Sequence, residues 1–419
     1  MESPKPSKTA QELHHSLVEY LKHGGHLPSP RIEAAFRAVP RHLFLPDLEL
    51  EQVYKDEPIP IKLQGEIPIS SSSQPTIMAI MLEQLGLKPG QRVLEIGAGT
   101  GYNAALIAHL VGEQGQVVTV DIDEDIVEQA RARLRAAGLE RVQVIHADGG
   151  QGYPEAAPYD RLLLTVSAAD IAPAWREQLQ PDGRLVLPLS LRGPQVSVAF
   201  EPRADYWISL SAVSCGFMRL RGSLSEPETK INLGPEPGLS IQFDSPPALE
   251  AETLYKSLTG PSRDWRTKVR VTLDDIIWGG LSLWLAARTS NTFLLNAEGP
   301  MLDRGLVPDL LEKPNAASTV GGLLDEGSLY VLMPPPAQAQ PPPELSEASP
   351  KFELCVRTFG PDEAAARRLG DHITAWERAG RPSAARLQLK AYASDSNYLP
   401  APNESVIVKR WSKIAIHWK

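Results

Sequence analysis

Three acidic residues, each near the end of a short apolar run, are the best candidates in this chain for binding a small ligand. Glu95 lies in "RVLEIGAG", Asp121 in "GQVVTVDID" and Asp148 in "VQVIHADG". If these runs are parallel strands, the carboxylates meet at the carboxyl edge of one sheet, where open α/β sheets bind ligands. There Asp121 can accept hydrogen bonds from both hydroxyls of a ribose, and Asp148 from the amino group of an adenine. A purely structural origin of this pattern is the less favoured interpretation.

A glycine turn, Gly97, Gly99 and Gly101, follows the first of these runs and precedes a helical pattern. Glycine lets the backbone turn sharply and approach a ligand closely. The spacing G-x-G-x-G differs from the G-x-G-x-x-G of dinucleotide-binding folds, and a plain tight turn would also explain it. The sequence has no G-x-x-x-x-G-K-[ST] loop and no arginine cluster near the glycines. A nucleoside without phosphates therefore fits best. S-adenosylmethionine, with S-adenosylhomocysteine as its product, is the predicted cofactor.

Alternating strand and helix patterns predict the elements that position these residues. Strands are expected at "RVLEIGAG", "GQVVTVDID", "VQVIHADG", "YDRLLLTVSA" and "RLVLPLS", and helices at "YNAALIAHLVG", "EDIVEQARARLRAAGL" and "APAWREQLQPDG". This alternation indicates βαβ units and a mostly parallel sheet, so the predicted class is α/β.

The alternation ends at Gly222, which divides the chain into three predicted parts. Residues 1–222 hold N-terminal helices and the α/β unit, and 223–249 form a linker rich in Pro, Gly, Ser and Glu. Residues 250–419 are predicted to form a C-terminal α+β domain, with a Pro-rich loop at 334–350 that has little capacity for a packed core.

Composition argues against several classes of function. The formal net charge of −9 disfavours a nucleic-acid partner, because such proteins carry a basic patch. Two cysteines cannot form a disulfide framework, and no cluster of His, Cys and acids has metal-ligand spacing, so no metal is predicted. The N-terminus does not read as a secretory signal, and no apolar stretch reaches about 18 residues. We therefore expect no membrane partner and a cytoplasmic location.

Some conspicuous side chains are predicted to be structural. Cys215 is interpreted as a buried small residue, and Trp175, Trp278 and Trp284 as core residues rather than a peptide-binding stripe. Ser73 is predicted to cap the helix "PTIMAIMLEQLGL", because serine is a favoured cap and proline is tolerated in the first turn. A helix N-terminus also attracts carboxylates, so capping and substrate binding are compatible.

Several motifs in order resemble the protein-L-isoaspartate O-methyltransferase family over roughly residues 30 to 200. They are "AAFRAVPRHLF", "YKDEPIP", "SSQP", the glycine turn, "ADGGQGY" and "QLQPDGRLVLPL". The resemblance implies a class I, Rossmann-like, S-adenosylmethionine-dependent methyltransferase that acts on a peptide carboxylate. The implied cofactor-binding residues are Glu95, Gly97, Gly99, Thr100, Gly101, Asn103, Asp121, Ile122, Asp148 and Gly149. The implied substrate-binding residues are Ser72, Gln74, Pro75, Thr165, Val166 and Ser167, with Ser73 as the catalytic hydroxyl.

The chain departs from typical members of that family in two respects. Thr76 stands where an aromatic residue or histidine often follows, and about half of the chain remains after the fifth strand. "CGFMRLRG" and "VKRWSKIAIHW" are similar to a longer branch associated with ribosomally made, cyclised peptides such as lanthipeptides and graspetides. This implies methylation of an aspartate in a modified precursor peptide, with the C-terminal domain as a candidate peptide-binding part. General isoaspartate repair is the alternative. Nucleic-acid methylation and a scaffold without catalysis rank lower.

The expected chemistry needs no general base, because a carboxylate with a pKa of about 4 is ionised at neutral pH. The protein has to align the carboxylate oxygen with the donated methyl group at a distance of about 3 Å. The methyl ester is a better leaving group than the free carboxylate. The next backbone nitrogen can then attack and close a succinimide, which opens to aspartate or isoaspartate.

Overall fold

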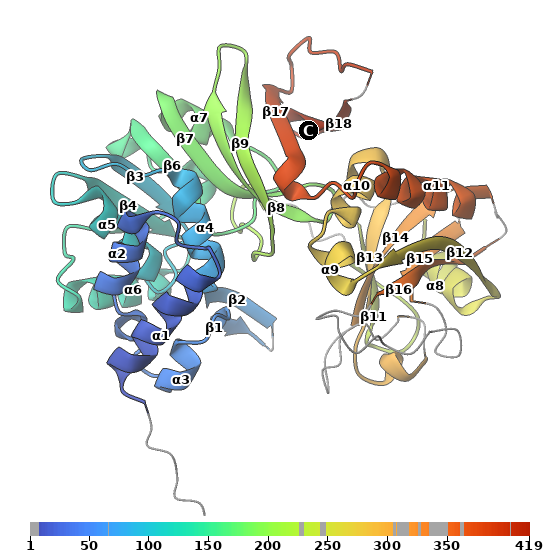
Figure 1. Cartoon of the computed structure of the whole chain (residues 1–419), viewed down its shortest axis with the longest axis horizontal. Helices are drawn as coiled ribbons and strands as arrows, with labels where there is room; N and C mark the ends of the chain where they lie inside the picture. The colour runs from blue at the N-terminus through green and yellow to red at the C-terminus, as the bar shows by residue number, and fades with distance from the viewer. Residues whose placement is uncertain are drawn as a thin grey trace, which may run out of the picture.

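Two sheets, one of ten strands and one of seven, organise the chain into two lobes (Figure 1). The computed structural model describes residues 8–65, 67–225, 230–243, 249–304, 307, 318–325, 328–334, 351–360, 364–402 and 404–419. The predicted Pro-rich loop at 334–350 lies outside the described residues, apart from Pro334.

Five parallel strands form one half of the ten-stranded sheet. In spatial order they are β5 (Gln143–His146), β4 (Gln116–Asp121), β3 (Arg92–Ile96), β6 (Tyr159–Leu164) and β7 (Leu179–Ser190). The helices between them are α5 (Tyr102–Val111), α6 (Glu124–Ala136) and α7 (Pro173–Gln178), with the short 3-10 helices η2 (Gly149–Gln151) and η3 (Pro154–Ala156). These strands correspond to the five predicted ones, and the α/β prediction is confirmed.

The local sequence explains this half of the sheet. Val93 and Leu94 are adjacent in β3 and fully buried, so both faces of the strand are covered, as in parallel sheets flanked by helices. In α6 the buried residues Ile126, Ala130 and Leu134 recur every four positions, which gives one apolar face against the sheet. The order β4-β3-β6 places a crossover between β3 and β6, and ligands bind at such a point in α/β sheets.

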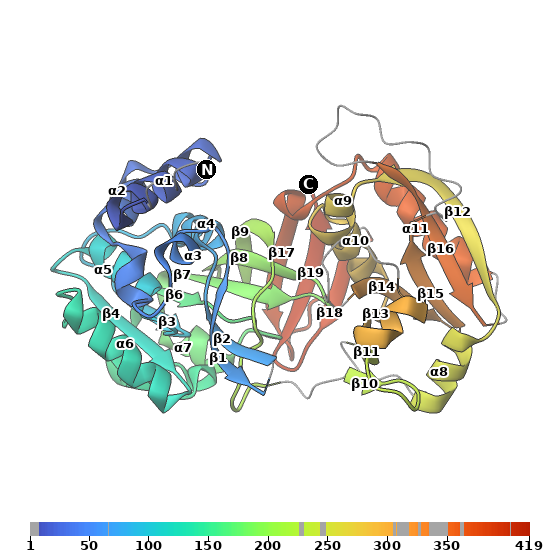
Figure 2. The same cartoon turned by 90° about the horizontal axis from the view of Figure 1, so that it is seen from below.

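Five antiparallel strands complete the same sheet. They are β8 (Gln195–Pro202), β9 (Tyr206–Cys215), β17 (Leu387–Ala393), β19 (Ser412–Trp418) and β18 (Ser405–Val408). The sheet is therefore mixed rather than mostly parallel. The predicted boundary assigned residues 387–418 to the C-terminal domain, but β17 pairs with β9, so this segment returns to the first lobe. Figure 2 shows β17, β18 and β19 between the two lobes.

The second lobe is an antiparallel sheet covered by helices. Its strands, in spatial order, are β10 (Lys230–Asn232), β11 (Leu239–Phe243), β13 (Thr292–Ala297), β14 (Ser318–Asp325), β15 (Ser328–Met333), β16 (Phe352–Phe359) and β12 (Ser262–Val271). Its helices are α8 (Ala251–Thr259), α9 (Leu273–Ile277), α10 (Leu281–Arg288), α11 (Ala364–Arg378) and the 3-10 helix η4 (Gly299–Arg304). The 3-10 helix η6 (Ala384–Arg386) instead packs on β9, and its Ala384 is buried in the core of the first lobe. Two strands, β10 and β11, lie within the predicted linker 223–249, so part of that linker belongs to this sheet.

The N-terminal segment packs beside the parallel strands and ends in a hairpin. It comprises α1 (Ala10–His23), α2 (Pro30–Ala38), η1 (Arg41–Phe44), α3 (Leu50–Val53), β1 (Ile59–Gln64) and β2 (Ile67–Ser72), followed by α4 (Pro75–Leu85). Pro40 separates α2 from η1, because proline disfavours the helical conformation of the residue before it. The β1–β2 hairpin was not predicted from the sequence. No helix among the described residues is long and apolar enough to span a membrane.

Side chains of α10 fasten the second lobe to the first. Leu283 and Ala287 are buried in the apolar cluster formed by one face of the ten-stranded sheet. The guanidinium of Arg192, in the β7–β8 turn, donates to the carbonyl oxygens of Ala286 at 3.2 Å and Thr289 at 2.9 Å. The two lobes therefore share packed apolar surface and hydrogen bonds.

Candidate active site

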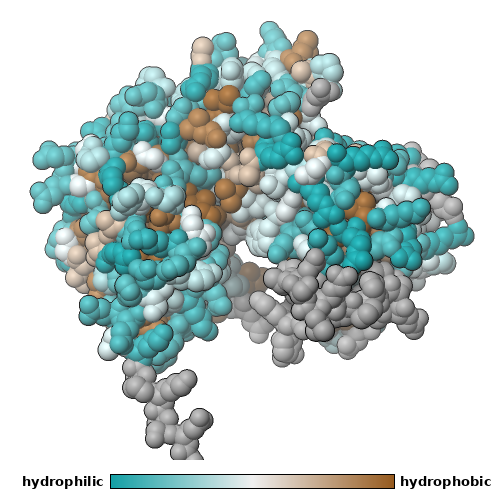
Figure 3. Space-filling model, in the orientation of Figure 1, coloured by the Kyte–Doolittle hydropathy of each residue, from teal (hydrophilic) through white to brown (hydrophobic). Residues whose placement is uncertain are grey.

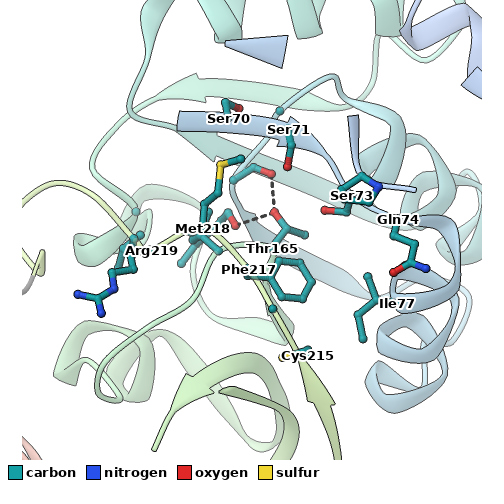
Figure 4. A pocket seen from close by; sticks show the side chains of 18 of the residues that line it. Ser70, Ser71, Ser73, Gln74, Ile77, Thr165, Cys215, Phe217, Met218 and Arg219 are labelled. Carbon is teal, nitrogen blue, oxygen red and sulfur yellow. Dashed lines mark hydrogen bonds between the residues drawn. The ribbon is translucent and has the colours of Figure 1, made fainter. Parts of the chain in front are cut away.

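A cleft of about 720 Å³ lies at the carboxyl edge of the parallel strands. Figure 4 shows serines of the β2 segment on one side of it and the segment after β9 on the other. The lining residues include Ser70, Ser71, Ser73, Gln74, Thr76, Ile77, Ile96, Gly97, Gly99, Asp121, Ile122, Gly149, Thr165, Val166, Cys215, Gly216, Phe217, Met218, Arg219, Leu220, Arg221 and Trp278. Pockets of this size hold drug-sized organic molecules.

The glycine turn approaches the cleft with its bare backbone. Gly97 and Gly99 have φ angles of 102° and 51°, a region that favours glycine. A Cβ atom on Gly97 would lie 2.5 Å from Thr165 Oγ1, so a side chain there would collide with the cleft wall. Gly101 is instead the N-cap of α5, and a Cβ atom there would lie 3.2 Å from Leu134 Cγ, so it serves helix packing. Two glycines of the turn, Gly97 and Gly99, therefore lie at the cleft, and Gly101 lies beneath it.

Asp121, at the end of β4, is the predicted acid that reaches the cleft. Its two carboxylate oxygens accept from the backbone N–H groups of Gly99 at 3.1 Å and Asp123 at 3.2 Å. Burial raises the pKa of Asp121, although these two backbone donors oppose the shift. Each oxygen retains a further lone pair, so the carboxylate can accept two more hydrogen bonds from a ligand.

Glu95 is completely buried beneath the glycine turn and does not line the cleft. Its carboxylate accepts from Asn103 Nδ2 at 2.7 Å and Thr119 Oγ1 at 2.6 Å, which ties β3 to α5 and β4. Burial raises the pKa of Glu95 to about 7, against the lowering effect of those two hydrogen bonds. Glu95 therefore supports the turn from below.

Asp148 follows β5, and backbone N–H groups of the protein already bind its carboxylate. Its oxygens accept from the backbone N–H groups of Gly150 at 2.9 Å and Ser223 at 2.7 Å. Burial alone would raise the pKa of Asp148, but the hydrogen bonds from Ser223 and Gly150 leave it lowered. The neighbouring Gly149 lines the cleft, whereas Asp148 does not.

Three of the four serines in the run face the cleft, and one is buried. Ser70, Ser71 and Ser73 line the cleft, whereas Ser72 is buried and lies 3.4 Å from Arg41 Nη2. Within the described part of the chain, no partner hydrogen-bonds to the hydroxyl of Ser73, so it can serve a ligand. Gln74 also lines the cleft, and the neighbouring Pro75 is buried as the first residue of α4.

The prediction that Ser73 caps α4 is wrong. Gln74 occupies the N-cap position without a side-chain cap of its own. Asp56 supplies the cap from another part of the chain, because its carboxylate accepts from Thr76 N at 2.8 Å and Thr76 Oγ1 at 2.7 Å. It also accepts from Gln74 Nε2 at 3.0 Å. Asp56 was visible in the "YKDEPIP" motif, but the sequence does not show that this motif lies next to α4.

Arg41, from the same upstream motifs, is a second residue that sequence reasoning missed. Its side chain is fully buried and donates to the backbone oxygens of Val53 at 3.0 Å, Lys55 at 3.1 Å and Ser73 at 3.0 Å. Burial lowers the pKa of Arg41. A buried guanidinium that binds carbonyl groups fixes the conformation of the chain on either side of the serine run.

The loop after β6 and the segment after β9 close the cleft together. Thr165 Oγ1 donates to the carbonyl oxygen of Gly97 at 2.8 Å, which is one of the dashed lines in Figure 4. Val166 lines the cleft beside it, whereas Ser167 is buried. The backbone N–H of Ser167 donates to Met218 O at 2.7 Å, and Leu220 N donates to Ser167 O at 2.8 Å. This pairing explains why the segment 217–222 faces the cleft.

Two further lining residues were predicted to be core residues. Cys215 is buried, and burial raises the pKa of its thiol to about 12, so the thiol is protonated at neutral pH. This agrees with the prediction that it is not a nucleophile. Trp278 does not follow the prediction, because it is half exposed and lines the cleft. Trp175 and Trp284 are buried as predicted.

The remaining predicted residues support the cleft from outside its surface. Those that do not line it are Ser72, Pro75, Glu95, Thr100, Gly101, Asn103, Asp148 and Ser167. Among the described residues, no group of three or more His, Cys, Asp or Glu side chains is arranged to hold a metal ion.

Comparisons with known proteins find one family, which matches the first half of the chain. A family model described as "Protein-L-isoaspartate(D-aspartate) O-methyltransferase" matches residues 11–223. A protein-L-isoaspartate O-methyltransferase of Methanopyrus kandleri is 39% identical over 226 residues, which cover 53% of this chain and 98% of the relative. One from Hyperthermus butylicus is 40% identical over 221 residues, covering 51% and 90%. A solved structure described as a protein-L-isoaspartate O-methyltransferase has 24% identity and a TM-score of 0.49, and the match covers 90% of this chain and 96% of that one.

Proposed function

The chain belongs to the protein-L-isoaspartate(D-aspartate) O-methyltransferase family, and from this premise we propose which residues carry its reaction. It is an S-adenosylmethionine-dependent methyltransferase of the class I fold. In this reading, the cleft binds the cofactor and the isoaspartyl carboxylate of a peptide or protein side by side. The observation that carries the proposal is the unpartnered Ser73 hydroxyl in the same cleft as Asp121, among the described residues.

The residues of the cleft fit the cofactor. The Asp121 carboxylate is proposed to accept from both ribose hydroxyls, and Gly97 and Gly99 allow close contact with the backbone. Ile122 and Gly149 are proposed to contact the adenine. The other predicted cofactor residues do not line the cleft and are proposed to support the glycine turn and the strand ends behind it. They are Glu95, Thr100, Gly101, Asn103 and Asp148.

The substrate carboxylate is proposed to bind at Ser73 and the start of α4. S-adenosylmethionine supplies a methyl group on a positively charged sulfonium. The protein needs no base, since the carboxylate is already ionised at neutral pH. Hydrogen bonds from a hydroxyl align the carboxylate and leave its oxygen nucleophilic. Gln74, held by Asp56, and Thr165, held by Gly97 O, are proposed to define the walls on either side.

A direct assay tests this proposal. The full-length protein is offered an isoaspartyl hexapeptide and its L-aspartyl counterpart with S-adenosylmethionine, and the products are followed by mass spectrometry. We expect the isoaspartyl peptide to gain one methyl group and then lose methanol as it closes to the succinimide. Absence of methylation of both peptides would contradict the proposal.

Tailoring of a ribosomally made, cyclised peptide is the second candidate. It was the first expectation from the sequence, but the relatives are isoaspartate methyltransferases, and the family match ends at residue 223. The feature that keeps it open is the second lobe, which lies outside the matched residues and contributes Trp278 to the cleft. Methylation of a cyclised aspartyl peptide, but not of the linear isoaspartyl peptide, would favour it.

A further inference from the structure

We propose that Arg219 and Trp278 form a recognition subsite for the peptide chain next to the methylated residue, with an acidic side chain of the substrate bound at Arg219. The inference rests on the proposed function, since it takes the cleft as the site of methyl transfer. It gives the second lobe a part in choosing the substrate.

The first observation is that the cleft continues toward the second lobe. Trp278 and Gly216 line both the cleft and an adjoining cavity of about 180 Å³. Arg219 lines both the cleft and another cavity, which Phe243 and Phe293 of the second sheet help to form. The two adjoining cavities share Gly193, Pro194 and Ser282. Together they make one groove between the lobes, and Figure 3 shows apolar side chains gathered beside that hollow.

The second observation is the charge of this groove. Arg219 is exposed, and within the described residues its guanidinium has no hydrogen-bond or ion-pair partner. In Figure 4 the guanidinium points away from Thr165. Among the described residues, no Asp or Glu lines either adjoining cavity, whereas Arg192 and Arg219 both line one of them. An acidic side chain is the group that such a groove binds best.

The third observation is that Trp278 is presented on a fixed backbone. The backbone carbonyl oxygen of Trp278 accepts from Ser214 Oγ in β9 at 2.8 Å, and the backbone N–H of Trp278 donates to Asp274 O at 2.8 Å. A Cβ atom on Gly216 would lie 3.8 Å from the indole ring, so the ring lies over this bare stretch of backbone. A half-exposed aromatic ring on a fixed backbone is a good anchor for a peptide, because little backbone entropy is lost on binding.

The occupant follows from the position of the groove. The methylated residue is part of a chain, so the chain must leave the cleft on at least one side. The groove leads away from the cleft past Arg219 and Trp278, and its apolar walls and positive charge suit a peptide that carries Asp or Glu next to the target residue.

The experiment uses the full-length protein and two isoaspartyl hexapeptides, one with glutamates and one with lysines beside the target residue. We expect the wild-type protein to prefer the glutamate peptide. Arg219→Glu should raise the KM for the glutamate peptide about tenfold and lower that for the lysine peptide, with kcat nearly unchanged, as for the loss of one charge pair in a groove. Trp278→Ala should raise the KM for both peptides by about tenfold.

Arg135→Glu and Tyr20→Ala are the matched controls, because both residues are exposed and neither lines the cleft. Both controls should keep wild-type KM values. Unchanged KM values in Arg219→Glu and Trp278→Ala, with normal methylation, would overturn the subsite and leave the proposed function intact. If the wild-type protein methylates neither peptide, the proposed function itself fails, and the subsite with it.

Discussion

Ser72 and Ser73 show how neighbouring residues of the same type can have different roles. The Ser72 side chain is buried beside Arg41, whereas the Ser73 side chain faces the cleft. Because successive side chains of an extended segment point to opposite sides, Ser72 points into the interior where Ser73 points into the cleft.

Ser73→Ala should lower kcat by about tenfold, since one hydrogen bond to the charged substrate contributes about 1.5 kcal/mol. Calorimetry should show an unchanged Kd for the cofactor. Ser72→Ala is the contrasting variant, and it should cost about 0.5 kcal/mol of unfolding free energy at unchanged kcat, because its contact at 3.4 Å is long. Equal kcat values for wild-type and Ser73→Ala would rule out the catalytic role.

Glu95→Gln should change how stability depends on pH. The pKa of Glu95 is raised from 4.5 to about 7 in the folded state, so its stabilising contribution is complete below pH 4.5 and is lost as the pH rises through 7. Glutamine has no proton to lose, so its contribution does not change with pH. Between pH 4.5 and 7 the difference in free energy of unfolding, variant minus wild-type, should therefore rise by about 3 kcal/mol. Urea unfolding at several pH values measures it, and parallel pH profiles would contradict it.

The acids show how far residue types alone can predict a site. Asp121 reaches the cleft as its place at a strand end predicts. Asp148 has an equivalent place, but Gly150 and the distant Ser223 satisfy its carboxylate. Ser223 lies 75 positions away in the sequence, and no local pattern could indicate that contact.

At the scale of elements, the start of α4 depends on a loop far from it in sequence. Asp56 caps the helix and also binds Gln74, whereas local sequence preference predicts Ser73 as the cap. A serine in front of a helix is a sound prediction of a cap. It fails here because the carboxylate of a packed loop competes for the same backbone N–H, and this leaves the serine hydroxyl free for the cleft.

Asp56→Ala should therefore impair both stability and catalysis. Loss of the cap should lower the free energy of unfolding by about 1 kcal/mol. Release of Gln74 should raise the KM for an isoaspartyl peptide. Thr76→Val removes only the hydroxyl contact and keeps the backbone cap, so it should have the smaller effect on stability. Denaturant titration and steady-state kinetics measure both quantities, and identical effects of the two variants would contradict the assignment of the cap.

At the scale of the whole molecule, the sequence predicts the parallel strands well because their apolar runs and intervening helices are local signals. It does not predict that β17 pairs with β9. These strands lie about 180 residues apart, as the hydrogen bond from Leu389 N to Ser209 Oγ illustrates. The segment 387–418 has strand patterns that fit either sheet, and only the packing of the complete chain decides between them.

This pairing determines how the second lobe can be removed. Ending the chain at residue 223 would expose β9 and the apolar cluster that Leu389, Ala391 and Ile414 complete, so the fragment should lose several kcal/mol and about 10 °C in Tm. Replacing residues 226–380 by a glycine–serine linker keeps β17 and β19 in place and should retain more of the Tm and the cofactor affinity. Calorimetry of both variants measures this difference. A truncated chain as stable as the internally deleted one would show that the returning strands add little to the first lobe.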